Sequence, residues 1–166
     1  MSEEKHTTVD DWLKKARSQL KVANNHLETR VNWSDAVQAA QQVVELSVKS
    51  LLLLLNVEFP PKHKWSKDDL RKIADQINQR RLIDKMKNHG LYWPTHLPRY
   101  LAIMNLWGDL YLFAKYGLES VGLASSEELF QHGEAELAVE HANECLRAAS
   151  ELSYLQPDKL ASIIQV

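Results

Sequence analysis

The side chains best suited to chemistry begin with a short run of cations, an imidazole and an indole. The run is Lys62, His63, Lys64 and Trp65, and Arg71, Arg80 and Arg81 follow it along the chain. Lysine, arginine and histidine can hold phosphate, and an indole face can stack a base. This pattern predicts a binding site for a nucleotide or RNA. The alternative is that Trp65 packs as a hydrophobic staple ahead of Ser66 while the lysines only solvate a loop.

Arginine and histidine together could also cleave RNA without a metal ion. An imidazole can remove the proton of a 2′-hydroxyl, and a guanidinium can stabilise the phosphate. Arg81 and His89, with seven residues between them, are the nearest such pair in the basic segment and the only catalytic candidates. The sequence has no glycine-rich phosphate loop, no zinc-ligand spacing and no nucleophile elbow. It therefore predicts no metal site and no cofactor, and it favours binding over catalysis.

The elements that must position these residues are all expected to be helices. No segment alternates with the period of a strand, whereas apolar residues recur at spacings of three and four. We predict an all-α, up-and-down bundle of four to five helices with short extra helices. We expect residues 1–166 to form one domain, with 1–7 and 157–166 as flexible or accessory ends. The expected helix N-caps are Thr8, Ser34, Ser66 and Ser126.

Two interruptions are predicted between the long helices. The apolar stripe loses phase at Arg80 and Arg81, which indicates a bend or two short helices. Residues 91–100 contain Pro94 and Pro98 and are expected to form a turn before the next helix, which Pro98 opens. The aromatic side chains of this turn could form a lid over a ligand or could simply pack, and packing is favoured. They are Tyr92, Trp93 and His96.

Five consecutive leucines at residues 51–55 need a buried environment. A membrane span requires about 20 apolar residues, but Lys49 precedes the leucines closely and Glu58 follows them. On the predicted helix, Leu53 and Leu54 point away from the core stripe, toward a covering loop or another subunit. Such a cluster is seldom exposed on a monomer, so we predict that they form the interface of a homodimer. The N-terminal sequence lacks a signal-peptide pattern, and we expect a cytoplasmic protein.

Charge is distributed unevenly along the chain. Residues 62–88 hold nine Lys or Arg against four Asp, and residues 118–155 hold eight Glu against Arg147 alone. The two segments could be solvated helix faces. They could also be a patch for phosphate-bearing ligands, or complementary ends of an assembly.

The segment at residues 40–52, AQQVVELSVKSLL, resembles the signature helix of the HEPN family of higher eukaryote and prokaryote nucleotide-binding helical domains. The matching positions are Ala40, Gln41, Gln42, Glu45, Lys49, Leu51 and Leu52. The resemblance continues through Pro61, His63 and Leu70 to the AKYG turn at residues 114–117. This chain departs from the family pattern at Gln19, where an aspartate is usual, and at Tyr111, where an arginine often stands.

The resemblance implies a homodimeric helical module that binds a nucleotide or RNA, or docks a partner such as a minimal nucleotidyltransferase. Gln42, Glu45 and Lys49 would then line a cleft or pair across it. Many relatives resemble metal-independent ribonucleases of toxin–antitoxin or defence type, which carry arginine, four to six residues, then histidine. That motif is absent here. The rivals are a ribonuclease that uses Arg81 and His89, and a domain for protein interaction alone.

Overall fold

The computed structural model describes residues 3–29, 32–118 and 122–165, which form helices and connecting loops without a strand. This confirms the predicted all-α class. The elements, in chain order, are α1 (Glu3–Thr29), α2 (Trp33–Leu54), α3 (Lys67–Gln79), α4 (Leu82–Asn88), the 3₁₀ helix η1 (Trp93–His96), α5 (Leu97–Tyr116), α6 (Ser126–Leu129), α7 (His132–Ser153) and α8 (Pro157–Ile164).

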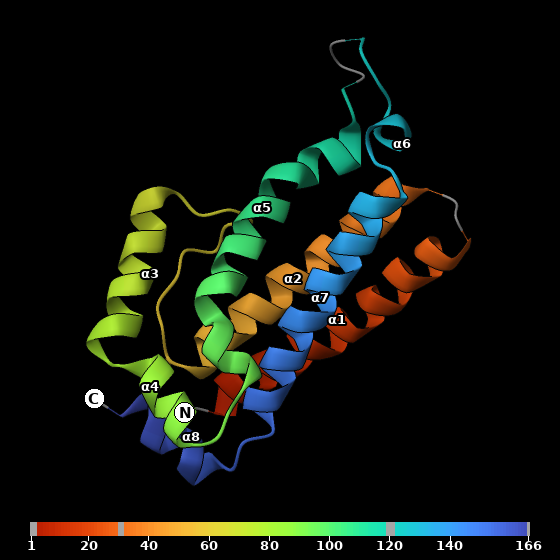
Figure 1. The fold of residues 1–166 in the computed structure, drawn as a ribbon. Helices are drawn as coiled ribbons and strands as arrows, with labels where there is room; N and C mark the ends of the chain where they lie inside the picture. Colours follow the sequence, from red (N-terminus) through yellow and green to blue (C-terminus); the bar gives the residue numbers. More distant parts are fainter. Residues whose placement is uncertain (1–2, 30–31, 119–121, 166) are drawn as a thin grey trace.

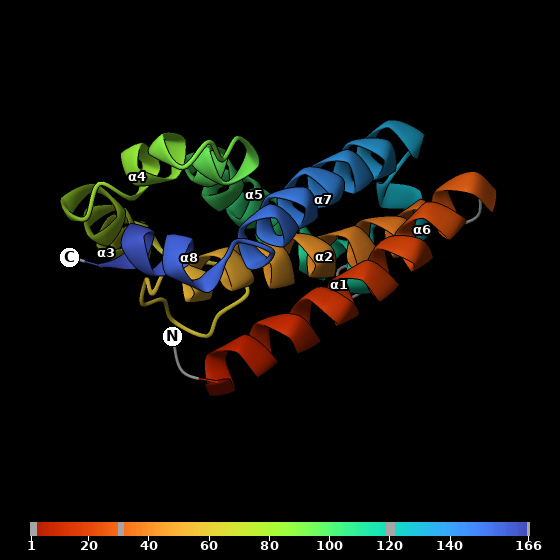
Figure 2. The same ribbon diagram turned by 90° about the horizontal axis from the view of Figure 1, so that it is seen from below.

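Helix α2 lies at the centre of the bundle, where it packs against α1, α5 and α7. Helices α3, α4 and α8 gather at one end, around the end of α2, and α6 lies at the other end beside the end of α5 (Figures 1 and 2). The basic segment therefore occupies one end of the molecule, and the acidic start of α7 lies at the other.

The central position of α2 explains the leucine tract. Leu51, Leu52, Leu54 and Leu55 are at most 1% exposed, and Leu53 is half-buried against the same core. The prediction that Leu54 faces another subunit is therefore wrong, because the chain covers this helix itself. Among the described helices, none combines the length and apolar character needed to cross a bilayer.

One predicted helix cap is confirmed. The Ser66 hydroxyl accepts a hydrogen bond from the Asp69 amide at 3.1 Å, and the Asp69 carboxylate accepts one from the Ser66 amide at 3.0 Å. This capping box opens α3 and satisfies two amides that the helix itself cannot pair. Beside it, the break at Arg81 is also confirmed, since this residue has φ 51° between α3 and α4.

The other predicted caps are wrong. Helix α1 already begins at Glu3, so Thr8 lies inside it, and Asn32, not Ser34, precedes α2 with φ 61°. Ser125 caps the short α6, and α7 starts separately after Gln131. Ser and Thr are tolerated inside a helix that packing stabilises, so their positions alone did not identify helix starts.

Arg80 joins the ends of two helices. Its guanidinium donates to the carbonyl oxygens of Leu55 and Asn56 at the end of α2 and to that of Ile164 at the end of α8, each at 2.9 Å. Carbonyls at a helix end lack partners within the helix and favour a cation. The prediction that Arg80 binds a ligand is therefore wrong.

The C-terminal segment was expected to be a flexible or accessory end. It forms α8, in which Leu160 and Ile163 are buried.

A buried histidine between α5 and α7 should make stability depend on pH. Trp107 Nε1 donates to His141 Nδ1 at 3.1 Å, and burial, with a contribution from Arg99, lowers the pKa of His141. The neutral imidazole is thus the folded form, and protonation favours unfolding. Its stabilising effect is complete above the unfolded pKa, near 6.5, and declines as the pH falls below it.

We expect His141→Gln to weaken this pH dependence, because the glutamine amide can accept the Trp107 bond without titrating. Urea denaturation at pH 7.5 and 5.5 measures the change. The wild type should lose more stability than the variant on this step, and equal losses would contradict the assignment. Arg99, Glu140 and Glu144, the charged groups around His141, are the same in both proteins.

Candidate functional site: a pocket beside the central helix

Seven side chains from three helices and one loop surround a small pocket of about 140 Å³. Helix α2 contributes most of them, and the rest come from α1, the loop before α3, and α5. They are Gln41, Gln42, Glu45, Leu46, Lys15, His63 and Tyr111. Four of these seven were singled out from the sequence, by the resemblance to the HEPN helix or by the basic run: Gln41, Gln42, Glu45 and His63.

Glu45 is the polar centre of this pocket. Its carboxylate lies 2.7 Å from His63 Nδ1 and 2.7 Å from Lys49 Nζ, and Gln41 Nε2 donates to it at 3.2 Å. Burial alone would raise the pKa of Glu45, but the hydrogen bonds from His63 and Lys49 outweigh burial and lower the pKa. The carboxylate is therefore charged at neutral pH, and it fixes the proton of His63 on Nδ1.

His63 presents its other nitrogen to the outside. Its side chain is 70% exposed, and its ring stacks on Tyr111 with 5.8 Å between centroids and 20° between planes. With Nδ1 held by Glu45, Nε2 remains for a ligand. A carboxylate that orients an imidazole in this way is the arrangement that prepares histidine for proton transfer or for binding an anion.

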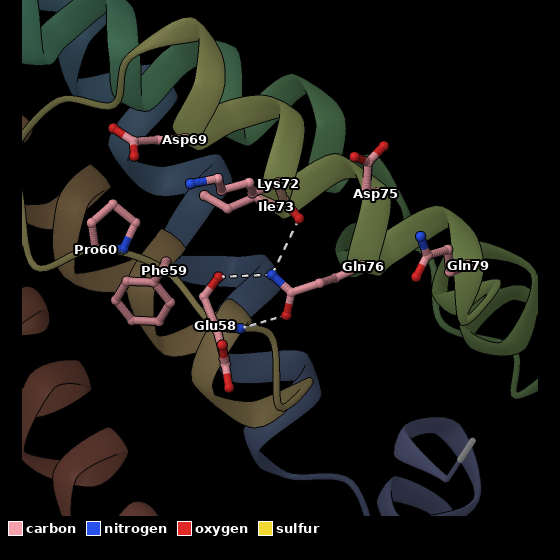
Figure 3. Close-up of a pocket in the computed structure, with 9 residues that line it drawn as sticks. All are labelled: Glu58, Phe59, Pro60, Asp69, Lys72, Ile73, Asp75, Gln76 and Gln79. Atoms are coloured by element: carbon pink, nitrogen blue, oxygen red, sulfur yellow. Dashed lines mark hydrogen bonds between the residues drawn. The ribbon is translucent and has the colours of Figure 1, made fainter.

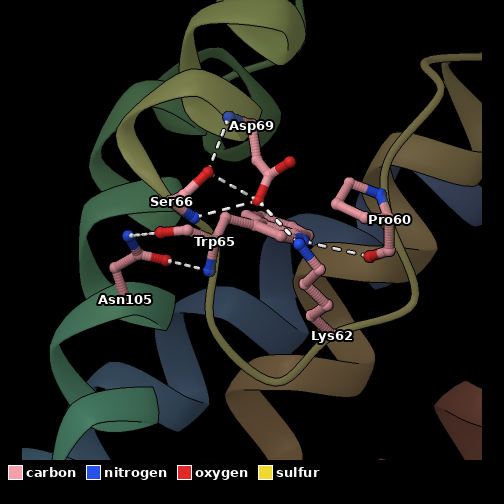
Figure 4. Close-up of polar contacts among 6 residues, drawn as sticks. All are labelled: Pro60, Lys62, Trp65, Ser66, Asp69 and Asn105. Atoms are coloured by element: carbon pink, nitrogen blue, oxygen red, sulfur yellow. Dashed lines mark hydrogen bonds and ion pairs between the residues drawn. The ribbon is translucent and has the colours of Figure 1, made fainter.

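The loop that carries His63 is fixed to α5 (Figure 4). The Asn105 side chain accepts from the Trp65 amide at 3.1 Å and donates to the Trp65 carbonyl at 2.9 Å. Lys64 forms an ion pair with Asp109 on the same helix. The Trp65 indole is buried, 1% exposed, and donates to the Pro60 carbonyl at 3.1 Å. These contacts fix the position of the loop, and therefore of His63, relative to α2.

Gly108 of α5 allows this close approach. A Cβ added at Gly108 would lie 2.7 Å from the His63 carbonyl oxygen and 3.4 Å from Lys64 Cβ. We expect Gly108→Ala to push the loop outward, to lower stability by about 1–3 kcal/mol and to weaken the contact between Glu45 and His63. Thermal unfolding and the NMR signals of the His63 imidazole measure the two effects.

Gly133→Ala provides the matched control, because a Cβ there meets no atom within 4 Å and the residue lies in a helix. Alanine favours helix by up to about 1 kcal/mol over glycine. This variant should be as stable as the wild type or slightly more stable. Equal effects of the two alanines would mean that the space around Gly108 does not hold the loop.

The structure brings together some of the predicted ligand-binding residues and separates others. Glu45, His63 and Lys49 form one connected group, and Gln42 lines the same pocket. The predicted stacking of a base on Trp65 is wrong, because no face of the buried indole is available; it packs just before the Ser66 cap, as the alternative interpretation expected.

The remaining cations of the basic run do not converge on the pocket. Lys62 pairs with Asp69 at 3.2 Å and Lys64 pairs with Asp109, while Arg71 is exposed on α3. Three pocket residues were missed by the sequence interpretation: Lys15, on the exposed side of α1, Leu46 of α2, and Tyr111 of α5. Only the departure of Tyr111 from the family pattern marked its position.

Arg81 and His89 do not form a catalytic pair. They flank α4 at opposite ends, and a seven-residue helix is roughly 10 Å long. Arg81 pairs with Asp84 at 3.1 Å, and His89 Nε2 lies 2.8 Å from the Ser162 hydroxyl of α8. The two side chains are thus engaged separately.

A larger groove of about 580 Å³ lies between residues 58–60 and α3 (Figure 3). The Gln76 amide spans its inner wall by accepting from the Glu58 amide at 2.9 Å and donating to the Glu58 carbonyl at 3.0 Å. Three carboxylates and one lysine line this groove: Glu58, Asp69, Asp75 and Lys72. This balance does not suit an anionic ligand. Within the described residues, no group of three or more His, Cys, Asp or Glu is placed to hold a metal ion.

Comparison with known proteins identifies the family of the chain. The comparisons with curated proteins and with solved structures found no match. The family model of the HEPN domain matches residues 9–152, nearly the whole chain and every residue of the pocket. The chain therefore belongs to the HEPN domain family.

Proposed function

We propose that this HEPN domain binds a phosphate-bearing ligand, a nucleotide or RNA, at the pocket of Glu45, His63 and Tyr111. The observation that carries the proposal is the short contact between the buried Glu45 carboxylate and His63. It holds an exposed imidazole in one orientation beside an aromatic ring. Binding sites of this kind place a few fixed polar groups in a small concavity.

The charges in the pocket support an anionic ligand. Lys49 is committed to Glu45, and Lys64 to Asp109. Lys15 lines the pocket and forms no ion pair with the described residues. It adds an uncompensated positive charge beside the His63 imidazole.

The size of the pocket limits what enters it. Its volume of about 140 Å³ corresponds to about four or five water molecules at 30 Å³ each. One phosphate group or one base edge fits, whereas a whole nucleotide does not. The rest of the ligand would lie across the open mouth, against the exposed faces of His63 and Tyr111.

Titration of labelled ATP and short RNA tests this proposal. His63→Ala and Tyr111→Ala should each weaken binding about tenfold or more, since base–aromatic stacking contributes roughly 1–3 kcal/mol, and Tyr111→Phe should retain the stacking. His132→Ala, an exposed histidine at the start of α7 that does not line the pocket, should bind as the wild type does. If the protein shows salt-dependent binding to neither ATP nor short RNA, the proposal is refuted.

We also propose that two copies of the chain pair, but through α5 instead of Leu53 and Leu54. Helix α5 exposes several large apolar side chains: Leu106 47%, Leu112 60%, Phe113 42% and Tyr116 60%. It runs from the basic end of the molecule to the acidic end (Figure 1). A two-fold axis across α5 therefore sets the basic end of one copy beside the acidic end of the other. Docking of a nucleotidyltransferase rests on the family resemblance alone.

Light scattering across a range of concentrations tests this pairing. The wild type should have twice the mass of one chain, and the Phe113→Asp variant should have the mass of a single chain. Val22→Asp on α1, 40% exposed, is the matched control and should leave the mass unchanged. A wild type that is monomeric at high concentration would refute the pairing.

Cleavage of RNA is the second candidate function, and it now involves His63 in place of Arg81 and His89. The geometry of Glu45 and His63 is that of a carboxylate that orients a general base. Incubation of RNA with the protein, beside a His63→Ala sample, separates the two functions. Cleavage lost in the variant supports catalysis. Binding without cleavage in the wild type limits the site to recognition.

A further inference from the structure

A second group of aromatic and basic side chains lies away from this pocket, where η1, α7 and α1 meet. Tyr92 and Tyr154 are 62% and 77% exposed, the largest exposed fractions among the described tyrosines. A chain of direct contacts connects them through α7. We propose that this surface, which we name the aromatic platform, binds single-stranded nucleic acid.

The platform starts at η1. The Tyr92 ring contacts Trp93 edge-on with 5.3 Å between centroids and contacts His96 with 4.9 Å. Arg147 of α7 lies over the Trp93 ring, 4.7 Å from its centroid. Both oxygens of Glu151 accept backbone amides, from Tyr92 at 3.2 Å and from Trp93 at 2.9 Å. The rings are therefore held against α7, and the carboxylate that holds them is already hydrogen-bonded.

The platform continues along α7 to α1. Tyr154 follows Arg147 by seven residues, two helical turns, so the two side chains project from the same face of α7. The Arg17 guanidinium of α1 donates to the Tyr154 hydroxyl at 3.2 Å and lies 3.4 Å from the Ser150 hydroxyl. Helices α1 and α7 also contact each other directly.

A basic stripe borders the platform. Lys14 and Lys21 are exposed on α1, three residues before and four residues after Arg17, and this spacing places all three cations on one side of the helix. Arg147, the one cation in the acidic segment, lies at the centre of the platform. Asp10 and Asp11 are exposed on α1 four and three residues before Lys14, so carboxylates stand at the start of this stripe.

This combination fits a single strand better than a duplex or a protein. Exposed aromatic faces stack unpaired bases of any sequence, and a row of cations beside them follows the phosphates. Paired bases within a duplex do not present their faces. A protein partner would require a larger apolar area than two tyrosine rings between charged residues.

The inference extends the proposed RNA binding to a separate surface, so the experiment must distinguish the two. Fluorescence anisotropy with a labelled twelve-nucleotide polyuridine measures the platform, and labelled ATP measures the pocket. Tyr92→Ala and Tyr154→Ala should each weaken polyuridine binding about tenfold and leave ATP binding unchanged. Leu123→Ala, a large apolar side chain that is 74% exposed in the loop after α5, is the control and should change the binding of neither ligand.

The salt dependence provides an independent measure. Lys14→Ala and Lys21→Ala should each lower the slope of log affinity against log salt by about 0.7, the value for one phosphate contact on a single strand. All of these residues are exposed, so the variants should fold, and thermal unfolding verifies this.

Three results would overturn the aromatic platform. The first is polyuridine binding that is unaffected by Tyr92→Ala and Tyr154→Ala but abolished by His63→Ala, which would leave the pocket proposal intact. The second is equal affinity for the matching duplex, which would exclude stacking. The third is no binding of polyuridine at all. If the wild type binds polyuridine but not ATP, and Tyr92→Ala and Tyr154→Ala weaken the polyuridine binding, the platform is supported independently of the pocket.

Discussion

Replacing Arg80 with glutamine is expected to destabilise the protein by about 3 kcal/mol, because one guanidinium serves two helix ends. In the variant, the carbonyls of Leu55, Asn56 and Ile164 lose their donors at 2.9 Å. Arg80 is partly buried, so water replaces these bonds incompletely. For a chain of this size, the loss corresponds to a decrease in Tm of about 6–12 °C.

The neighbouring arginine is the control for this prediction. Arg81 is exposed and pairs only with Asp84, three residues away, and pairs of this kind contribute less than about 1 kcal/mol. Arg81→Gln keeps an L-residue at the same left-handed backbone position and should shift Tm by about 2–4 °C at most. Calorimetry of both variants compares the same chemical change at adjacent positions. Similar shifts would show that the link between α2 and α8 does not stabilise the fold.

The contrast between these arginines shows what the sequence could and could not reveal. The break in the apolar pattern at residues 80 and 81 predicted the turn correctly, because helical periodicity is a local property of the chain. The role of Arg80 depends on Leu55 and Ile164, which are 25 and 84 residues away. In the sequence, both arginines had the character of phosphate ligands. Only the tertiary structure shows that their roles differ.

The candidate site was predictable to a similar extent. The positions of Glu45, Lys49 and His63 followed from the resemblance to HEPN helices, and the structure brings the three together. Tyr111 and Lys15 come from helices whose rotation about their axes is set by packing, so no local pattern indicated that they face the same pocket. Trp65 was misassigned because an indole in a basic loop has the same sequence signature whether it is exposed or buried.

The second large effect is expected at the centre of the pocket. Glu45→Ala removes the carboxylate that accepts from Lys49, His63 and Gln41. The Lys49 side chain is only 11% exposed, so it becomes a nearly buried cation without a partner. Removal of one member of such a pair costs about 3 kcal/mol or more. Ligand binding should be lost as well, since His63 is no longer oriented.

The dependence of this effect on pH has a definite sign. The folded-state pKa of Glu45 is lowered, so its contribution to stability is present above the unfolded pKa near 4.3 and is lost as the pH falls through the folded value. Denaturation curves for the wild type and Glu45→Ala should therefore differ most at neutral pH and converge toward pH 3. A constant difference across this range would mean that the ionised carboxylate does not stabilise the fold.

The double variant Glu45→Leu with Lys49→Leu separates stability from function. A buried ion pair can often be replaced by apolar residues without loss of stability, whereas removal of one partner is costly. We expect the double variant to unfold within about 1 kcal/mol of the wild type and still to fail to bind ATP. Binding retained in this variant would refute the role of Glu45 in orienting His63. Instability equal to that of Glu45→Ala would show that the pocket requires the charges themselves.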